Sequence, residues 1–402
     1  MQSPKLRFKA DDGSEYPAWE EMKLGDIGSV AMCKRVYKAQ TSTEGDVPFF
    51  KIGTFGGEPD AFISRELYEN LRRKYSFPAK GTVLLSASGT IGRQVVYNGE
   101  DAYYQDSNIV WLDHDNTVID DFLRQFYNVV TWQGLEGSTI KRLYNKMILE
   151  TPFNRPCFLE QHKIANLLSS VDEIIAAQQA EVEGWKAYKH AVVQRLLSQQ
   201  VRFKADKISE YPAWEKNTLG ELGAFTKGAS LSKADISADG TPLILYGELY
   251  TTYDEVAYRV VRRTKQNVDD KFLSHVGDVL IPTSGETAEE IATATCVMQK
   301  GVVLAGDLYV YRTTNKLDGR IASYLLNHQV GGQISSLAQG KSVVHVQAKE
   351  LEKISVCYPA SFEEQQKIAD CLSSFDEVIA KARAELEQWR LLKKGLLQQM
   401  FV

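Results

Sequence analysis

Clusters of basic residues interleaved with aromatic residues are the clearest candidate binding residues in this sequence. Arg and Lys neutralise phosphates, and Arg can also bind guanine edges bidentately in the major groove of DNA. A single such cluster is more often a solvated surface, but clusters occur here in both halves of the chain. We therefore predict DNA-contacting side chains in both halves, namely Lys34, Arg35, Lys38, Arg72, Arg73 and Lys74 in the first and Arg259, Arg262, Arg263 and Lys265 in the second.

Two later segments and two small turns add to this set. The segments read GSTIKRLYNK at 137–146 and GKSVVHVQAK at 340–349, and the turns are Ser-Gly-Thr at 88–90 and Ser-Gly-Glu at 284–286. Hydroxyl groups near basic clusters can read bases or orient the phosphate backbone. We predict further DNA contacts from Lys141, Arg142, Lys146, Lys341, His345 and Lys349 in the segments, and from Ser88, Thr90 and Ser284 in the turns.

Catalytic and cofactor motifs were sought and rejected. Gly340-Lys341-Ser342 resembles the end of a phosphate-binding loop, but Ser335 stands where that motif needs its first glycine. The run 53–57, GTFGG, is not a dinucleotide-binding motif, and the six histidines are isolated. Paired carboxylates at 172–173 and 376–377 are interpreted as solvated helix faces. The sequence therefore predicts no catalytic residues, no metal site and no cofactor bound by this chain.

The candidate residues lie in two copies of an internal sequence repeat, so the same fold is expected to position both sets. Residues 7–20, RFKADDGSEYPAWE, and 202–215, RFKADKISEYPAWE, differ at only two positions. Leu24, Gly25 and Gly28 recur as Leu219, Gly220 and Gly223. The 88–90 turn, the 137–146 segment and the helical region beyond them recur at offsets of 196, 203 and 204 residues. The slowly growing offset indicates two copies of one unit, with short insertions in the loops of the second.

Each copy ends in a long predicted helix, Gln161–Gln200 and Gln365–Val402. Apolar residues recur there at alternating steps of four and three, which is typical of a coiled coil. Two such seams in one chain can bury each other, and we predict an intramolecular antiparallel pair rather than two unrelated helices. The expected seam residues are Ile164, Leu168, Val171, Ile175, Val182 and Trp185 in the first helix and Ile368, Leu372, Phe375, Ile379, Leu386 and Trp389 in the second.

The two copies are related cyclically. Residues 3–10, SPKLRFKA, match 198–205, SQQVRFKA, which directly follow the first long helix. The helix that should precede the first copy is the C-terminal one, so the termini should be adjacent in a pseudo-twofold molecule. Strand-like segments bounded by glycine, at 47–52, 82–85, 94–97 and 107–112, and later helical segments at 119–133 and 317–330 predict mixed α/β (α+β) domains. The expected boundaries are 1–155, 156–200, 201–360 and 361–402, in the order domain, helix, domain, helix.

Composition fits a cytoplasmic protein without membrane spans. The chain has 402 residues, 44% of them hydrophobic and 25% charged, which is enough for two or three domains. No apolar run is long enough to span a bilayer, and residues 1–13 do not read as a signal peptide. The five scattered cysteines are expected to be free thiols. The net charge of −5 argues weakly against a nucleic-acid partner, although a local basic face can bind DNA on an acidic chain.

The duplicated motifs resemble the specificity (S) subunits of type I restriction–modification systems. The resemblance rests on QHKIANLLSSVDEIIA from Gln161 and QQKIADCLSSFDEVIA from Gln365, on the two SEYPAWE segments, and on GSTIKRLYNK and GKSVVHVQAK. It covers essentially the whole chain. It implies two similar target recognition domains, each of which reads half of a bipartite double-stranded DNA site. Two long helices would form an antiparallel coiled coil that sets the spacer.

The resemblance also implies the partners. Two methylation (M) subunits would bind S-adenosylmethionine and flip an adenine, and motor-nuclease (R) subunits can join with ATP and Mg. The chain itself would not be an enzyme. Two alternatives remain open: a coiled-coil protein adaptor without DNA specificity, and a stand-alone adenine DNA methyltransferase. The missing catalytic tetrapeptide and glycine-rich cofactor loop argue against the methyltransferase, and the basic-aromatic clusters argue against the adaptor.

Overall fold

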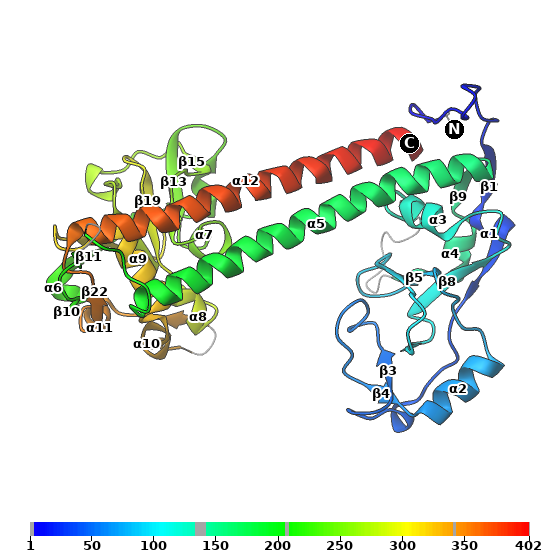
Figure 1. The fold of residues 1–402 in the computed structure, drawn as a ribbon, viewed down its shortest axis with the longest axis horizontal. Helices are drawn as coiled ribbons and strands as arrows, with labels where there is room; N and C mark the ends of the chain where they lie inside the picture. The colour runs from blue at the N-terminus through cyan, green and yellow to red at the C-terminus, as the bar shows by residue number, and fades with distance from the viewer. Residues whose placement is uncertain (1–3, 133–141, 206–208, 341–342, 402) are drawn as a thin grey trace. The chain divides into compact units, whose positions relative to one another are not determined.

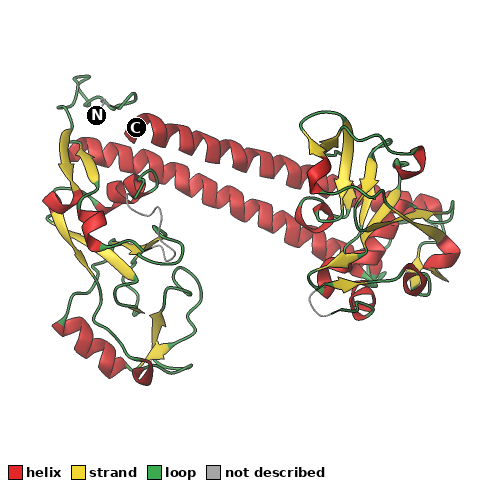
Figure 2. Ribbon diagram, turned by 180° about the vertical axis from the view of Figure 1, so that it is seen from behind, coloured by secondary structure: helices red, strands yellow, loops and turns green. Residues whose placement is uncertain are grey.

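Two long helices and two sets of β-rich elements make up the chain (Figures 1 and 2). The computed structural model describes residues 4–132, 142–205, 209–340 and 343–401. It divides into two compact units. Unit 1 runs up to Gln179 and includes the chain from Ala384 onward, and unit 2 is Ala180–Arg383. The helices α5 (Phe158–Leu197) and α12 (Phe362–Phe401) each contribute one end to each unit.

Unit 1 is a mixed α/β domain packed on helix ends. Its strands form a four-stranded sheet in the order β2-β8-β5-β6, a three-stranded sheet in the order β4-β3-β7, and the pair β1-β9. The elements are β1 (Glu20–Lys23), α1 (Leu24–Ile27), β2 (Gly28–Ala31), η1 (Lys38–Gln40), β3 (Val47–Phe50), β4 (Phe62–Ile63), α2 (Arg65–Lys74), β5 (Val83–Ser86), β6 (Gln94–Val96), β7 (Tyr103–Tyr104), β8 (Ile109–His114), α3 (Asp120–Tyr127), α4 (Asn145–Leu149) and β9 (Pro152–Arg155).

Unit 2 repeats this plan with extra elements. Its sheets have the orders β11-β20-β16-β18-β14, β12-β15-β13-β19, β17-β21 and β10-β22. The elements are β10 (Glu215–Thr218), α6 (Leu219–Leu222), β11 (Gly223–Lys227), η2 (Lys233–Asp235), β12 (Ile236–Ser237), β13 (Thr241–Leu245), α7 (Glu248–Thr251), β14 (Val256–Ala257), β15 (Arg262–Thr264), η3 (Asp270–Phe272), β16 (Asp278–Pro282), β17 (Ser284–Gly285), α8 (Ala288–Ile291), β18 (Thr295–Val297), β19 (Val303–Ala305), β20 (Leu308–Thr313), α9 (Gly319–His328), α10 (Gly331–Ser336), β21 (Val344–His345), α11 (Ala348–Leu351) and β22 (Ser355–Tyr358).

The repeated glycines have a steric reason. Gly28 opens β2 opposite His114 of β8, and Gly223 opens β11 opposite Thr313 of β20. A Cβ atom at Gly28 would lie 2.3 Å from the Asp113 carbonyl oxygen, and one at Gly223 would lie 2.7 Å from the Arg312 carbonyl oxygen. No side chain fits at such a close backbone approach. The shared glycine therefore marks the same strand crossing in both units.

Helix ends complete the core of each unit. In unit 1, Leu397 and Met400 of α12 are buried with Ile164 and Leu168 of α5. The reciprocal arrangement occurs in unit 2, where Val193, Leu196 and Leu197 of α5 share a core with Ile368, Ala369 and Leu372 of α12. In each unit, the start of one helix thus packs with the end of the other. The predicted antiparallel pairing is confirmed.

The predicted adjacency of the termini is also confirmed. The amide of Leu6 donates to the carbonyl of Gln399 at 3.0 Å, and the amide of Val201 donates to the carbonyl of Arg195 at 3.2 Å. These hydrogen bonds are equivalent under the repeat. In unit 2 the second forms just after α5 within a continuous chain, whereas in unit 1 the first joins the N-terminal segment to α12. The cyclic relation seen in the sequence is therefore a physical contact.

The seam is less uniform than predicted. Its aliphatic residues Ile164, Leu168, Val182, Ile368, Leu372, Ile379 and Leu386 are buried, and Val171 is too, but Ile175, Phe375 and both tryptophans are only half-buried. Trp185 packs at its edge, with its ring centroid 6.2 Å from that of Tyr188 and 6.5 Å from that of Phe375. The predicted seam residues Trp185 and Trp389 are thus less buried than the aliphatic residues of the seam.

Trp389→Ala tests this difference in burial. Because the indole is half-buried, we expect a loss of about 1–2 kcal/mol in the free energy of unfolding. Leu386→Ala is the matched control on the same helix, since Leu386 is 4% exposed, and it should cost about 2–5 kcal/mol. Urea denaturation of both variants gives the comparison. A larger loss at Trp389 than at Leu386 would contradict the half-buried placement.

Most predicted local elements are present with shifted ends. The strand-like segments 47–52, 82–85, 94–97 and 107–112 correspond to β3, β5, β6 and β8. The helical segment predicted at 119–133 ends as α3 at Tyr127, because Asn128 and two β-branched valines follow it. Helix α2 was not predicted, although Ser64 caps it by accepting a hydrogen bond from the amide of Leu67.

Candidate nucleic-acid interface

The Ser-Gly turns and the late segments meet in both units. In unit 1, Ser88 forms an antiparallel bridge with Arg142. In unit 2, β17 pairs with β21, and Ser284 lies opposite His345. Leu143 donates its amide to the Ala87 carbonyl, and the equivalent Val346 donates to the Thr283 carbonyl. The structure therefore brings together residues that the sequence suggested only as separate motifs.

In each unit a third residue contacts the serine of this bridge, and the sequence analysis did not identify it. The Ser88 hydroxyl donates to Asn108 Oδ1 at 3.0 Å, and the Ser284 hydroxyl donates to Asp307 Oδ2 at 3.2 Å. Asn108 and Asp307 are equivalent, because each directly precedes the paired strand β8 or β20. Their backbone carbonyls accept equivalent amides, those of Ala87 and Thr283. Alignment of β8 with β20 at an offset of 199 would have found this pair.

The side chain of Arg142 is held in place by two contacts. Its Nη2 donates to the carbonyl of Ser107 at 2.7 Å, and its guanidinium lies 6.0 Å from the ring centroid of Tyr144. Ser107 has a φ of 56°, which is uncommon for a residue other than glycine. The Arg142 side chain is thus pre-positioned, which lowers the entropic cost of binding a ligand.

A cleft of about 1200 Å³ opens beside this point in unit 2. His345 and Asp307 line it, together with Arg262, whose Nε lies 2.8 Å from Glu248 Oε1. The side chain of Glu248 is only 4% exposed, so the ion pair fixes the guanidinium at the wall of the cleft. Sequence reasoning missed four other lining residues that suit nucleic acid, namely Lys227, Lys233, Tyr246 and Tyr250.

The two basic clusters of unit 1 are neighbours. Lys34 Nζ lies 5.0 Å from the ring centroid of Tyr75, at the end of α2. Arg72 packs over Tyr68 and Phe77 with centroid distances of 5.7 and 5.2 Å. Cation–π contacts of this kind keep a cation at the surface without neutralising its charge. The exposed members of this surface are Lys34, Arg35, Lys38, Arg72, Arg73 and Lys74.

The remaining predicted residues that the structure describes are exposed but differ in their partners. Arg35 pairs with Asp106 at 2.7 Å, Lys265 with Asp239 at 2.8 Å, and Lys146 with Glu150 at 3.7 Å. Exposed pairs of this kind are weak, so a phosphate can compete for the cation. Arg263 donates to the Gly240 carbonyl at 2.8 Å. Thr90, Arg259 and Lys349 are exposed, whereas Lys141 and Lys341 lie outside the described residues.

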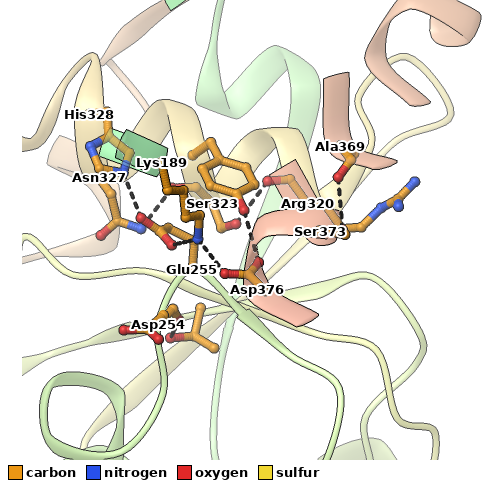
Figure 3. Close-up of polar contacts among 12 residues, drawn as sticks. Lys189, Asp254, Glu255, Arg320, Ser323, Asn327, His328, Ala369, Ser373 and Asp376 are labelled. Carbon is orange, nitrogen blue, oxygen red and sulfur yellow. Dashed lines mark hydrogen bonds and ion pairs between the residues drawn. The ribbon is translucent and has the colours of Figure 1, made fainter. Parts of the chain in front are cut away.

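A buried charged network attaches the domain of unit 2 to both helices (Figure 3). Lys189 Nζ of α5 lies 2.6 Å from Asp376 Oδ1 of α12 and 2.6 Å from Glu255 Oε2, just before β14. His328 Nε2 of α9 lies 2.7 Å from Glu255 Oε1. Burial opposes ionisation of Glu255, but the hydrogen bond with His328 and the charge of Lys189 prevail and lower its pKa to about 2.

Unit 1 holds the reciprocal pair. Lys393 of α12 donates to Asp172 of α5, and Gln125 of α3 donates to the same carboxylate at 2.9 Å. Asp376 likewise accepts from Tyr324 of α9 at 3.3 Å. The interpretation of Asp172 and Asp376 as part of solvated faces is therefore wrong. Both carboxylates join the two helices to the neighbouring domain, because an antiparallel pair places each lysine opposite the partner helix's aspartate.

A second repeated contact explains the duplicated RFKAD and SEYPAWE segments. Arg7 Nη2 lies 2.7 Å from Glu160 Oε2, and Arg202 Nη2 lies 2.9 Å from Glu364 Oε2. Both carboxylate side chains are 0% exposed. The indoles of Trp19 and Trp214 donate to the same glutamates at 3.0 and 3.4 Å. The repeated motif thus fastens each domain to the start of its helix.

Two searches covered the part of the chain that the structure describes. In it, no group of three or more His, Cys, Asp or Glu side chains is arranged to hold a metal ion. None of its helices combines the length and the apolar character that a membrane crossing requires. The cysteines of this part, Cys33, Cys157, Cys296, Cys357 and Cys371, are free thiols.

Comparisons with known proteins agree on one family. Residues 17–184 and 212–388 match the model of the type I restriction modification DNA specificity domain. A putative type I restriction enzyme specificity subunit of Haemophilus influenzae is 50% identical over 154 residues, which are 38% of this chain and 40% of that protein. The putative type I restriction enzyme MjaX specificity subunit of Methanocaldococcus jannaschii is 25% identical over 97% of this chain and 94% of its own length.

Two solved structures share the fold. The S subunit of a type I restriction-modification system from M. genitalium covers 100% of this chain and 99% of its own, with a TM-score of 0.60 and 16% identity. A chain from a study of complex assembly and conformational transition of the type I R-M system covers 96% of this chain and 98% of its own, with a TM-score of 0.51 and 14% identity.

Proposed function

This chain belongs to the type I restriction modification DNA specificity family, and we propose that each of its two units reads one half of a bipartite site on double-stranded DNA. The observation that carries the proposal is the recurrence of one backbone frame, Ser88 with Arg142 and Ser284 with His345, beside basic surfaces in both units. Arg and Lys at these surfaces supply phosphate contacts, and the framed side chains reach base edges.

We propose that the helix pair sets the unread spacer between the half-sites. Helices α5 and α12 have 40 residues each, which corresponds to about 60 Å at 1.5 Å per residue. The reciprocal Lys–Asp pairs fix the axial register of the two helices. Moving either helix by one turn would separate Lys189 from Asp376 and Lys393 from Asp172.

The chain is proposed to act without catalysis of its own, as a scaffold for two methylation subunits and for motor-nuclease subunits. S-adenosylmethionine, ATP and Mg would then bind only to those partners. Matching exposed apolar residues support two equivalent docking surfaces. Phe158 and Phe362 are 50% and 44% exposed at equivalent helix starts, and Tyr188 and Leu392 are 56% and 46% exposed at equivalent later positions. Two like surfaces can recruit two copies of one partner.

The decisive experiment is a map of methylated adenines. The chain would be co-expressed with a type I methylation subunit that co-purifies with it, in a host without adenine methylation. We expect a split motif with two defined halves and a fixed gap. Replacement of residues 20–150 by the corresponding part of another specificity subunit should change only one half.

Other outcomes separate the alternatives. A stable complex that methylates no defined motif would contradict DNA recognition and favour the protein adaptor. Binding of S-adenosylmethionine to the isolated chain would favour the stand-alone methyltransferase. DNA affinity of the isolated chain that falls steeply with salt would exclude the adaptor, because phosphate contacts release counterions. A swap of 20–150 that altered both halves would overturn the assignment of one half to each unit.

A further inference from the structure

Two corresponding three-residue sites stand out when the units are compared. The unit 1 site consists of Ser88, Asn108 and Arg142, and the unit 2 site consists of Ser284, Asp307 and His345. In both sites the serine hydroxyl donates to the second residue, and the third residue lies opposite the serine in a short antiparallel bridge. The sites therefore share one geometry.

Main-chain hydrogen bonds maintain that geometry. The amide of Ala87 donates to the Asn108 carbonyl at 2.7 Å, and the amide of Thr283 donates to the Asp307 carbonyl at 2.8 Å. The bonds from Leu143 to Ala87 and from Val346 to Thr283 close the other side. Because these bonds do not involve side chains, the frame tolerates different residues at its second and third positions.

The side chains differ between the sites in the property that distinguishes bases. Asn108 offers both a donor and an acceptor, whereas an ionised Asp307 only accepts. The planar guanidinium of Arg142 offers several N–H donors in a fixed arrangement, whereas the imidazole of His345 offers one or two N–H donors. A purely structural role would favour the same residues in both copies, as happens with the serine. Retention of the frame with exchange of the hydrogen-bonding groups is what two readers of different sequences require.

We propose that these sites are the specificity-determining positions of the two units, which deepens and rests on the proposed DNA-recognition function. Asn side chains pair bidentately with adenine and Arg with guanine, whereas a carboxylate accepts from the exocyclic amine of cytosine. Asn108 and Arg142 accordingly select adenine and guanine in the half-site of unit 1. Asp307 selects cytosine in the half-site of unit 2, with His345 as a neighbouring donor.

The surroundings of Asp307 suit this role. Its side chain is exposed at the wall of the cleft of about 1200 Å³, next to His345. Lys227, Lys233 and Arg262 line the same cleft and can bind the flanking phosphates. An exposed carboxylate repels the phosphates of DNA, so it weakens binding unless it accepts a hydrogen bond from a donor on a base. The cations around it thus hold the DNA, and Asp307 supplies the discrimination.

The test is Asp307→Asn in the intact complex with the methylation subunit. Asn has nearly the same shape and can keep the contact with the Ser284 hydroxyl, so the frame should survive. We expect one position in the unit 2 half-site to change from cytosine towards adenine, with a shift in relative methylation on the order of 10-fold or more. The other half-site and the gap should be unchanged. Lys353→Ala is the control, because Lys353 is exposed, pairs with Glu350 and is not among the predicted DNA-contacting residues.

The outcomes are separable. If the unaltered chain directs no split motif, the proposed function itself fails. If it directs one and Asp307→Asn leaves every base preference intact, this inference is overturned and the proposed function stands. If methylation is lost altogether, affinities for duplexes carrying each base pair at each position of that half-site decide the matter. A changed order of preference supports the inference, and uniform weakening overturns it.

Discussion

Replacement of Lys189 by methionine is expected to lower the free energy of unfolding of unit 2 by about 3–5 kcal/mol. The side chain of Lys189 is only 7% exposed, and its ammonium group lies 2.6 Å from a carboxylate oxygen of both Glu255 and Asp376. Methionine preserves most of the volume and removes the charge. Two carboxylates would then face each other without a cation between them, away from most of the solvent.

The dependence of this loss on pH identifies its cause. In the unaltered protein the pKa of Glu255 is lowered to about 2 from its ordinary value of 4.5, so its contribution to stability is present above pH 4.5 and is lost as the pH falls towards 2. Burial raises the pKa of Asp376, which offsets part of that loss. Without Lys189 both carboxylates should take up protons more readily. The difference between variant and unaltered protein should therefore be largest at neutral pH and shrink towards pH 4.

Lys393→Met is the matched control. Lys393 is 17% exposed and its partner Asp172 is 27% exposed, so solvent can compensate part of the lost pairing in unit 1. Urea denaturation at pH 7, 5 and 4 measures both variants. A loss below about 1 kcal/mol at Lys189, as is usual for exposed ion pairs, would show that the network is not buried in solution. A loss that did not change with pH would contradict its electrostatic origin.

The repeat made much of this fold predictable. Periodic apolar residues located both long helices, and the match of SPKLRFKA to SQQVRFKA located the contact between the N-terminal segment and α12, seen as the hydrogen bond from Leu6 to Gln399. The resemblance to type I specificity subunits agrees with the family match. Such features were predictable because they depend on spacing along one segment or on direct repetition, both of which are visible in a single sequence.

The candidate site was only half predictable. Ser88, Arg142, Ser284 and His345 belonged to repeated motifs, but Asn108 and Asp307 did not, because their side chains differ and small insertions separate their offset from those of the motifs. The cleft in unit 2 joins residues from Lys227 to Val346 that meet only after the sheets form. The roles of Asp172 and Asp376 required the register of the helix pair, which one helix alone does not reveal.

Arg202→Ala is expected to lower the free energy of unfolding by about 3–5 kcal/mol, because it leaves the buried carboxylate of Glu364 without its cationic partner. That carboxylate accepts from Arg202 Nε at 3.1 Å and Nη2 at 2.9 Å, and its side chain is 0% exposed. Arg202 also donates to the Pro212 carbonyl at 2.8 Å. The change therefore removes the contacts by which Arg202 holds the start of α12 and the backbone at Pro212 together within unit 2.

Arg7→Ala provides a matched comparison within the same chain. Its bonds to Glu160 are 3.0 and 2.7 Å long, and it likewise donates to a proline carbonyl, that of Pro17. If the cyclic relation holds in solution, the two variants should lose similar stability in their own units. Peptide-resolved hydrogen exchange can measure this near residues 158–168 and 362–372. In the methylation assay, each variant should weaken modification without changing the bases of the motif, because the arginines fasten the domains and do not face the cleft. A large loss at Arg202 with none at Arg7 would contradict the equivalence of the two attachments.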